Sequence, residues 1–343
     1  MQITAVTTMR DEGPFVLEWL AHLRALGVGH VLVYTNDCTD GTDRLLDAVA
    51  KDGWVTHIAQ DVPKGKSPQW SALKEAWTHP AVTSADWITV LDVDEFPDVA
   101  VGGKNLVDLI NDVPDADGIV MPWRLFGNAG VVGFADTPVG QQFTRCALPG
   151  TMFPIATTFF KSLIRRDGPF SGLGVHRPKQ KNADRHGHPV WYDGAGNRLP
   201  DFFTKNVKRL SLVGTGMGRS KVELRHYSLK SVEAFMIKRA RGLPNRSSKP
   251  IDLSYWVNRN FGKMDGGPLA PAHYDWSAPV LTAHAACVLA YRQKIAQLTK
   301  DADAFAVFCD LILAGQAKEI APESANQLYH LFQDTVDNPT QVT

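Results

Sequence analysis

The strongest structural signal in this sequence is the stretch Trp87-Ile88-Thr89-Val90-Leu91-Asp92-Val93-Asp94-Glu95-Phe96-Pro97. Its apolar and β-branched residues, up to Leu91, predict a buried strand that is covered on both faces, as in a parallel α/β sheet. Because Pro97 cannot continue a hydrogen-bonded ladder, we expect the strand to end at the acidic residues. The carboxylates are therefore expected at the carboxyl end of this strand.

The spacing of Asp92 and Asp94 suits a cation. Side chains alternate along a strand, so both carboxylates are expected to point the same way. Two converging carboxylates form a hard oxygen site for Mg²⁺ or Mn²⁺, and a metal ion keeps both of them ionised. The alternative interpretation is an ordinary solvated turn at the end of the strand, because surface turns are rich in Asp.

The composition limits the class of partner. With 343 residues the chain is long enough for a large α/β domain with an appended piece. Lys plus Arg and Asp plus Glu both number 36, so the formal net charge is zero. A protein that binds nucleic acid by neutralising phosphates needs excess positive charge, and we expect no nucleic-acid partner. Basic residues are enriched between residues 161 and 249, which suits a local anionic ligand or a solvated face.

The cysteines and the hydropathy pattern favour a cytoplasmic protein. No basic and apolar leader opens the sequence, and no uncharged apolar run is long enough to cross a bilayer. We therefore expect neither secretion nor a transmembrane segment, and we keep peripheral association with the inner membrane face as an option. Neither a zinc ribbon nor a disulfide framework is suggested by the scattered positions Cys38, Cys146, Cys287 and Cys309.

The first hundred residues alternate between strand and helix patterns. Strands are predicted at residues 3–8, 30–34, 54–59 and 87–91, with helices between them. Right-handed crossovers then give an open, mostly parallel sheet flanked by helices. In such a sheet ligands bind beyond the carboxyl ends of the strands. The predicted strand ends carry Arg10, Asp11, Glu12, Asn36, Asp37, Asp92 and Asp94.

Later segments extend this pattern. Further strands are predicted at residues 118–123, 157–165 and 222–227. Ser231 is a good N-cap for a helix that ends at Arg241, and two more helices are predicted at residues 281–298 and 304–313. No Gly-rich phosphate-binding motif follows the first strand, so a dinucleotide site or a P-loop has no support.

Together these motifs resemble a bacterial glycosyltransferase of the Rossmann-like GT-A fold, in the group related to families 2 and 92. The resemblance predicts a GT-A domain over residues 1–245, with a nucleotide-binding half (1–100) and an acceptor-binding half (101–245). A mainly helical extension over residues 246–343 follows. The motifs that carry the resemblance are Arg10-Asp11-Glu12 with Phe15 and Glu18-Trp19, Asn36-Asp37-Cys38-Thr39-Asp40-Gly41-Thr42, Asp92-Val93-Asp94-Glu95-Phe96, and His226-Tyr227 with Lys230-Ser231, Phe235 and Lys238.

The resemblance implies transfer of a sugar from a UDP- or GDP-linked donor to a hydroxyl of a glycan or glycolipid, as in polysaccharide biosynthesis. Mn²⁺ or Mg²⁺ would stabilise the leaving nucleoside diphosphate as a Lewis acid. The implied metal ligands are Asp92, Asp94 and His226, and an ordinary hydrogen-bonded histidine is the alternative for His226. The residues implied in donor binding are Thr7, Arg10, Glu12, Asn36, Asp37, Gln69, Asp92 and Lys230. For Arg10 the alternative is a surface salt bridge with Asp11 or Glu12.

An inverting reaction needs a base that removes the acceptor proton. The candidates are Glu95, Asp167 and His176, and the sequence does not choose among them, so a retaining reaction also stays open. Asp167-Gly168-Pro169 also suits a simple turn.

Two other functions stay open on the same fold. A sugar nucleotidyltransferase would share the metal site, although no Gly-rich, Arg-containing loop follows the first strand. A non-catalytic carbohydrate- or nucleotide-binding protein would need neither the metal nor three polar strand ends. A phosphatase of the haloacid dehalogenase class does not fit, because its Asp-x-Asp motif lies on the first strand and not after the fourth.

Overall fold

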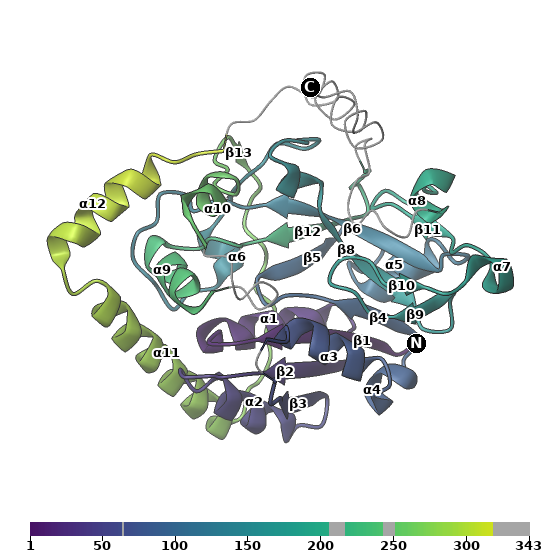
Figure 1. The fold of residues 1–343 in the computed structure, drawn as a ribbon, viewed down its shortest axis with the longest axis horizontal. Coiled ribbons are helices and arrows are strands. Elements are labelled where there is room, and N and C mark those ends of the chain that lie inside the picture. The colour runs from purple at the N-terminus through teal and green to yellow at the C-terminus, as the bar shows by residue number, and fades with distance from the viewer. Residues whose placement is uncertain (64, 206–216, 243–250, 318–343) are drawn as a thin grey trace.

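The computed structural model describes residues 1–63, 65–205, 217–242 and 251–317, and its centre is a nine-stranded sheet (Figure 1). The strand order is β3-β2-β1-β4-β8-β6-β12-β5, and β11 pairs with β6. These strands are β1 (Ile3–Met9), β2 (His30–Thr35), β3 (Val55–Ala59), β4 (Trp87–Val90), β5 (Glu95–Val99), β6 (Gly118–Leu125), β8 (Phe160–Arg165), β11 (Trp191–Tyr192) and β12 (Val222–His226).

Helices and short strand pairs surround this sheet. The helices are α1 (Gly13–Ala25), α2 (Thr42–Ala50), α3 (Pro68–Ala76), α4 (Pro80–Thr83), α5 (Leu106–Asn111), α6 (Val139–Gln142), α7 (Ala183–His186), α8 (Asp201–Lys205), α9 (Val232–Arg241), α10 (Leu253–Val257), α11 (Ala278–Leu298) and α12 (Ala302–Leu313), with a 3₁₀ helix at Ile155–Thr158. The short strands are β7 (Arg145–Cys146), β9 (Phe170–Gly172), β10 (Lys179–Gln180) and β13 (Met264–Asp265).

Most strands of the large sheet run in one direction. β1 is parallel to β2 and β4, and β2 is parallel to β3. β8 is antiparallel to both β4 and β6, so β6 and its parallel neighbour β12 run the same way as β1. β8 and the edge strand β5 run the opposite way. The predicted α/β architecture, a mostly parallel open sheet flanked by helices, is confirmed.

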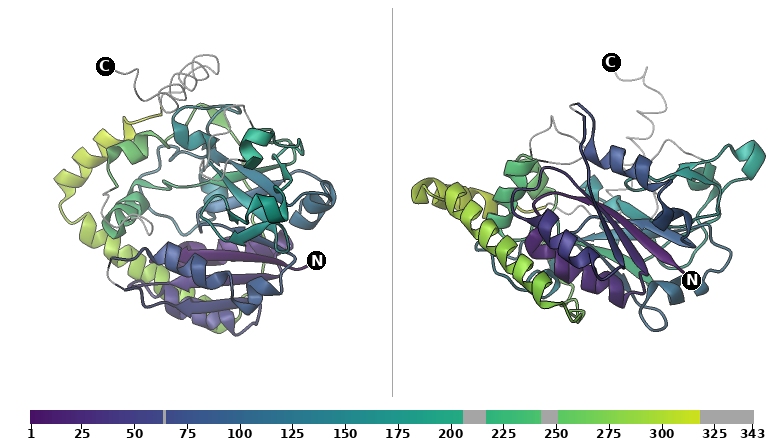
Figure 2. Two further views of the ribbon diagram at one scale, coloured as in Figure 1. Left: turned by 45° about the vertical axis from the view of Figure 1, so that its right-hand side comes forward. Right: turned by 90° about the horizontal axis from the view of Figure 1, so that it is seen from below.

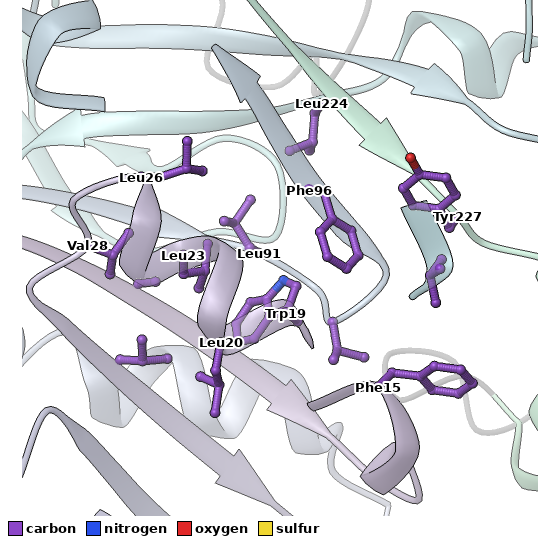
Figure 3. Packing of buried hydrophobic residues seen from close by; sticks show 14 of the residues in the cluster. Phe15, Trp19, Leu20, Leu23, Leu26, Val28, Leu91, Phe96, Leu224 and Tyr227 are labelled. Carbon is purple, nitrogen blue, oxygen red and sulfur yellow. The ribbon is translucent and has the colours of Figure 1, made fainter. Parts of the chain in front are cut away.

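Alternating side chains bury both faces of the sheet. Ala5 and Val33 pack with α1 and α2 in one apolar cluster, whereas Val6 and Leu32 pack with α3 and α4 in another. Figure 3 shows part of the first cluster, where Trp19 lies among apolar side chains from α1, β5 and β12. This two-sided burial explains why β2 and β4 carry apolar side chains on both faces, and it leaves the strand ends for polar residues.

Side-chain caps mark the starts of two helices, and that at Ser231 confirms the prediction. The Ser67 hydroxyl accepts a hydrogen bond from the Trp70 N–H (3.4 Å), and Pro68 occupies the first helical position of α3. The Ser231 hydroxyl accepts one from the Ala234 N–H (3.2 Å) at the start of α9.

One strand differs from expectation, because β5 contains Pro97, which pairs with Leu224 of β12. β5 lies at the edge of the sheet, where a proline is tolerated because one side of the strand needs no partner. The expectation that Pro97 lies outside the ladder is therefore wrong. The pairing of β5 with β12 also sets Glu95 opposite His226.

One helix beyond residue 250, α11, packs against the N-terminal half. Figure 2 shows α11 alongside α1 and α2, and it also contacts α9. Tyr291 of α11 is buried edge-on to Phe15, with 5.7 Å between ring centroids. Lys294 Nζ lies 3.1 Å from an Asp11 carboxylate oxygen. None of the helices in the described ranges combines the length and apolar character that spanning a membrane requires.

Candidate active site

The carboxyl ends of several parallel strands meet at one edge of the sheet. β1 and β2 end there and are followed directly by Arg10 and Asn36, and β4 ends two residues before Asp92. The strand predicted at residues 222–227 enters the sheet as β12, and its last residue, His226, lies at the same edge. Polar groups far apart in the chain are thus gathered at one place.

Asp92 and Asp94 lie in a tight turn and not on an extended strand. The Glu95 N–H donates to the Asp92 carbonyl (3.0 Å), and the Asp92 N–H donates to Glu95 Oε2 (2.8 Å). Strand alternation therefore does not apply to this pair. The two carboxylates have different partners, so the expectation that they converge on one cation is wrong, as is the alternative of a merely solvated turn.

Asp92 is paired with a buried lysine from β8. Lys161 is fully buried, and its Nζ lies 3.1 Å from Asp92 Oδ2 and 3.3 Å from Glu95 Oε2. Burial alone would lower the pKa of Lys161, but the charges of Asp92 and Glu95 outweigh it and raise the pKa. Burial raises the pKa of Glu95 well above its usual value, although Lys161 opposes this. Lys161 is therefore charged and holds Asp92.

Asp94 is buried between two partners, the Lys238 ammonium and the His226 imidazole. Lys238 Nζ lies 2.8 Å from its Oδ2, and His226 Nε2 lies 3.5 Å from its Oδ1. Burial would raise the pKa of Asp94, but Lys238 and His226 outweigh this and hold the pKa well below its usual range. The Asp94 carbonyl also accepts the Tyr227 N–H (2.8 Å). Asp94 is thus anchored on all sides, with an exposed fraction of only 6%.

These contacts test the expected metal site. The structure brings Asp94 and His226 together, but Lys238 occupies one Asp94 oxygen and Lys161 occupies one Asp92 oxygen. A divalent ion bound to both carboxylates would lie against two ammonium groups, which repel it. Within the described ranges no group of three or more His, Cys, Asp or Glu side chains is placed to hold a metal ion. The residues present therefore do not fit the metal that the resemblance implies.

The loop after β1 is tied to α9 and α11. Arg241 donates to the carbonyls of Arg10 (2.6 Å) and Asp11 (3.0 Å) and forms an ion pair with Glu12. Arg10 in turn donates to the Arg241 carbonyl, and the alternative of a surface salt bridge with Asp11 or Glu12 is not what the structure shows. Asp11 accepts the Thr39 N–H (2.6 Å). Arg10 and Glu12 thus have structural partners that the sequence did not reveal.

The other expected donor-binding residues are spread along the same edge. Gln69 Nε2 donates to Asp92 Oδ1 at 3.4 Å, so α3 reaches the acidic turn. Asn36 donates to Asp37 Oδ2 (2.9 Å), and Asp37 is exposed with a φ of 50°. Thr7 is buried in β1, and its hydroxyl has no hydrogen-bond partner among the described residues.

Lys230 lies close to Asp94, directly before α9. Its Nζ lies 4.1 Å from the centroid of the Phe15 ring and 3.8 Å from Glu12 Oε2. The N–H groups of Val232 and Glu233 donate to the Val131 and Val132 carbonyls (both 3.1 Å). These two donors are therefore taken and do not point at a ligand.

The three candidate bases lie in different places. Glu95 is fully buried beside Lys161. Asp167 is exposed after Arg165, which pairs with Trp87 at the amino end of β4, so it lies at the opposite edge of the sheet. His176 lies near the acidic turn, edge-on to Trp123 with 5.3 Å between ring centroids, and Trp123 also contacts His226.

His176 has the geometry of a base. Its Nδ1 lies 2.8 Å from the Phe160 carbonyl, which can only accept, so Nδ1 carries the proton and Nε2 keeps its lone pair. Burial, followed by the charge of Lys161, lowers the pKa of His176 to about 4. The imidazole is therefore neutral near pH 7.

The N-terminal part of the sequence, which contains most of these strand ends, matches a known protein family. Residues 4–138 match the model of glycosyltransferase family 92. The match confirms the predicted resemblance to a GT-A glycosyltransferase related to family 92, and its range contains the loop after β1 and the turn from Asp92 to Glu95. No curated protein matches the sequence.

Solved structures give weaker likenesses. Glucosyl-3-phosphoglycerate synthase from Mycobacterium tuberculosis, solved with Mg²⁺ and UDP, is 16% identical with a TM-score of 0.29, over 50% of this chain and 60% of the synthase. A mannosyltransferase from S. cerevisiae is 12% identical with a TM-score of 0.25, over 38% of this chain and 41% of that one. A putative glucose-1-phosphate thymidylyltransferase from Bacillus anthracis is 11% identical with a TM-score of 0.29, over 48% and 72%. At these scores the likenesses carry no argument about substrate or site.

Sequence reasoning gave no role to Lys161, Lys238 and Arg241. A signal for the last two exists, because Ala234, Ile237, Lys238 and Arg241 share one face of α9 at the spacing of a buried helix stripe. Two cations on an otherwise apolar face predict buried acidic partners. Lys161 gives a similar signal, since it interrupts the apolar strand β8.

Proposed function

We propose that this chain is a glycosyltransferase that moves a sugar from a nucleotide-sugar donor to an acceptor hydroxyl. The observation that carries the proposal is the family 92 match over residues 4–138, which covers the strand ends where the polar groups are gathered. The donor would lie across the carboxyl edge of the sheet, the usual ligand position in an open α/β sheet. UDP or GDP as the nucleotide, and a glycan or glycolipid as the acceptor, stay predictions from the sequence. The same holds for a cytoplasmic location and for peripheral membrane association.

We propose His176 as the base for an inverting reaction. Its Nε2 lone pair is available, because Nδ1 donates to the Phe160 carbonyl. The neutral imidazole would accept the acceptor proton as the new glycosidic bond forms. Glu95 is a poorer candidate because it is fully buried and its carboxylate lies against Lys161 Nζ (3.3 Å). Asp167 lies at the far edge of the sheet.

The proposal assigns no catalytic step to a divalent cation, and the assays test whether the activity depends on one. Lys161 and Lys238 already neutralise the carboxylates expected to bind it. Each assay is therefore run with Mn²⁺, with Mg²⁺ and with EDTA.

The test is a screen of UDP-, GDP-, dTDP- and CMP-sugars for release of free nucleotide, with and without simple sugar acceptors. We expect release from at least one donor, and a loss of about a hundredfold or more in rate for His176→Ala with an acceptor present. Asp167→Asn is the matched control and should keep the wild-type rate. A protein that neither binds nor cleaves any of these donors under any metal condition contradicts the proposal. Pyrophosphate release from a nucleoside triphosphate and a sugar phosphate would instead indicate the nucleotidyltransferase.

A further inference from the structure

Two consecutive residues of β8, Lys161 and Ser162, hold two different parts of the proposed site. Side chains alternate along a strand, so these two point to opposite faces of the sheet. Lys161 Nζ lies 3.1 Å from Asp92 Oδ2 in the acidic turn. The Ser162 hydroxyl donates a hydrogen bond to the His176 carbonyl (2.6 Å). β8 therefore connects the acidic turn to the proposed base.

β8 is a rigid support for both contacts. It lies inside the large sheet, where its antiparallel neighbours β4 and β6 pair with it on both sides. Such central strands open only when the whole domain unfolds. Ser162 itself is 6% exposed and lies opposite Val120 of β6. Its hydroxyl therefore has a fixed position relative to the carboxyl edge of the sheet.

His176 has no such support from its own segment, which lies between β9 and β10 and outside any helix or strand. Contacts on either side keep the segment in place, because Val175 is buried in an apolar cluster and Arg177 donates to the Phe203 carbonyl (2.6 Å). Neither of these contacts fixes the peptide group of His176, whereas the hydrogen bond from Ser162 does. The position of the base thus depends on a residue 14 positions earlier in the chain.

The imidazole ring of His176 is fixed separately. The Phe160 carbonyl accepts a hydrogen bond from its Nδ1 (2.8 Å), and the rings of Trp123 and Phe159 pack against it with 5.3 Å and 5.4 Å between centroids. Phe160 sets the tautomer, and Ser162 sets the main chain from which the ring projects. Both contacts aim Nε2, and displacing a catalytic group by about 1 Å can cost about a hundredfold in rate.

We propose that Ser162 is a positioning residue for the sugar transfer, which touches no substrate and acts through His176. The inference rests on the proposed function and deepens it, since it names what holds the base. A serine that only stabilised the fold would lower the activity of every variant. A serine that acts through His176 affects the rate only while His176 is present, so the two roles are separable.

Steady-state kinetics of the full chain, with the donor and acceptor found in the nucleotide-sugar screen, test this role. Ser162→Ala should lower kcat by about tenfold and leave the KM for the donor within about twofold, because the base and not the donor site is displaced. In a His176→Ala background, Ser162→Ala should cause no further loss. Thr4→Val is the matched control and should keep the wild-type kcat. The Thr4 hydroxyl is also buried and donates to the carbonyl of a distant residue, Ala81 (2.8 Å).

NMR of the full chain with ¹⁵N-labelled histidine gives a readout that needs no activity. The wild-type His176 signals, assigned by their loss in His176→Ala, should show one tautomer with the proton on Nδ1. In Ser162→Ala they should move toward values averaged over both tautomers, because a displaced ring loses its alignment with the Phe160 carbonyl. Thr4→Val should leave them unchanged.

The outcomes separate this inference from the proposed function. A wild-type kcat in Ser162→Ala, or an equal further loss in the His176→Ala background, overturns the inference and leaves the glycosyltransferase standing. His176 signals that are the same in the wild type and in Ser162→Ala also overturn it. Absence of sugar transfer in every condition, with the tautomer change present, overturns the proposed function and leaves Ser162 as the support of a histidine outside that chemistry.

Discussion

At the scale of single residues, the acidic motif is a set of buried ion pairs. Removing one member of such a pair leaves the other charge buried without a partner, which costs about 3–5 kcal/mol. Replacing both members with neutral groups is far less costly. Asp94 and Lys238 are both largely buried, so they belong to this class.

Asp94→Asn and Lys238→Met should each lower the free energy of unfolding by roughly 3–5 kcal/mol, because each leaves an unpaired buried charge. The double variant should lose less than the sum of the two losses, since neither charge is left. Urea unfolding of the four proteins in this cycle gives the coupling energy. Asp112→Asn, which breaks the partly exposed pair with Lys221, is the control and should cost under about 1 kcal/mol. Strictly additive losses would show that Asp94 and Lys238 are not paired.

His22 should make stability depend on pH. It is buried, its Nε2 contacts the Pro97 carbonyl (2.8 Å), and burial lowers its pKa to about 4. Between about pH 6.5 and pH 4 the unfolded chain binds a proton at His22 and the folded chain does not, so stability falls as pH falls. The contribution is fully present above about pH 6.5, and its loss reaches roughly 3 kcal/mol near pH 4.

The comparison is between the wild type and His22→Gln, whose amide can still donate to the Pro97 carbonyl. Denaturant unfolding at several values from pH 7 to pH 4 should show a shallower loss of stability in the variant. His273→Gln, at an exposed position, is the control and should keep the wild-type slope. Equal slopes for the wild type and His22→Gln would mean that His22 is protonated in the folded chain.

At the scale of elements, the contact between α1 and α11 leaves no room for a side chain at Gly13. A Cβ added there would lie 2.5 Å from Cys287 Cβ and 2.7 Å from Cys287 Sγ. Gly13→Ala should therefore push α11 away and lower the free energy of unfolding by about 1–3 kcal/mol, measured by thermal or urea unfolding. Gly133→Ala is the control, because the nearest atom to its added Cβ is 4.0 Å away. Cys287→Gly in the Gly13→Ala background should restore part of the loss, and its failure to do so would argue against this packing.

Elements were predictable where their signals are local. Ser67-Pro68 and Ser231 predict helix starts because a cap needs only the residues that follow it. The strand β5 was missed because its place in the sheet comes from β12, more than a hundred residues further along the chain. Pro97, which predicts the end of a ladder in a central strand, is compatible with an edge strand, and the sequence does not say where the edge is.

At the scale of the whole molecule, the fold was predictable from local signals, whereas the partners of the site residues were not. The polar strand ends were predicted because parallel strands share a carboxyl edge, and this brought Asp92, Asp94 and His226 to one region. The partners of the two aspartates were not predicted. Lys161 lies 69 positions after Asp92, and Lys238 lies 144 positions after Asp94. Such contacts depend on the packing of β8 and α9, which the sequence does not show. As a result, two aspartates at a spacing typical of metal binding form ion pairs with lysines instead.

The packing of α11 also bears on the proposed boundary near residue 245. Val280, Cys287, Tyr291 and Ile295 of α11 are buried in the same apolar cluster as α1. Each buried apolar side chain of this kind contributes roughly 1.5–3 kcal/mol, so four contribute about 6–12 kcal/mol. This matches the roughly 5–15 kcal/mol that stabilises a whole domain. The helices after residue 245 are therefore expected to complete the core of the sheet domain.

A chain that ends at residue 245 should accordingly fail to fold, or fold without a cooperative transition, because the apolar faces of α1 and α2 lose their cover. Circular dichroism during heating, together with limited proteolysis, compares this truncated chain with the full one. Within the full chain, Tyr291→Ala should cost about 3–5 kcal/mol, because Tyr291 packs against Phe15. Leu289→Ala, on the same helix but 58% exposed, should change stability by less than about 0.5 kcal/mol. A truncated chain that melts cooperatively within a few degrees of the full chain would make residues 246–343 a separate addition, with Tyr291 contributing little to the sheet domain.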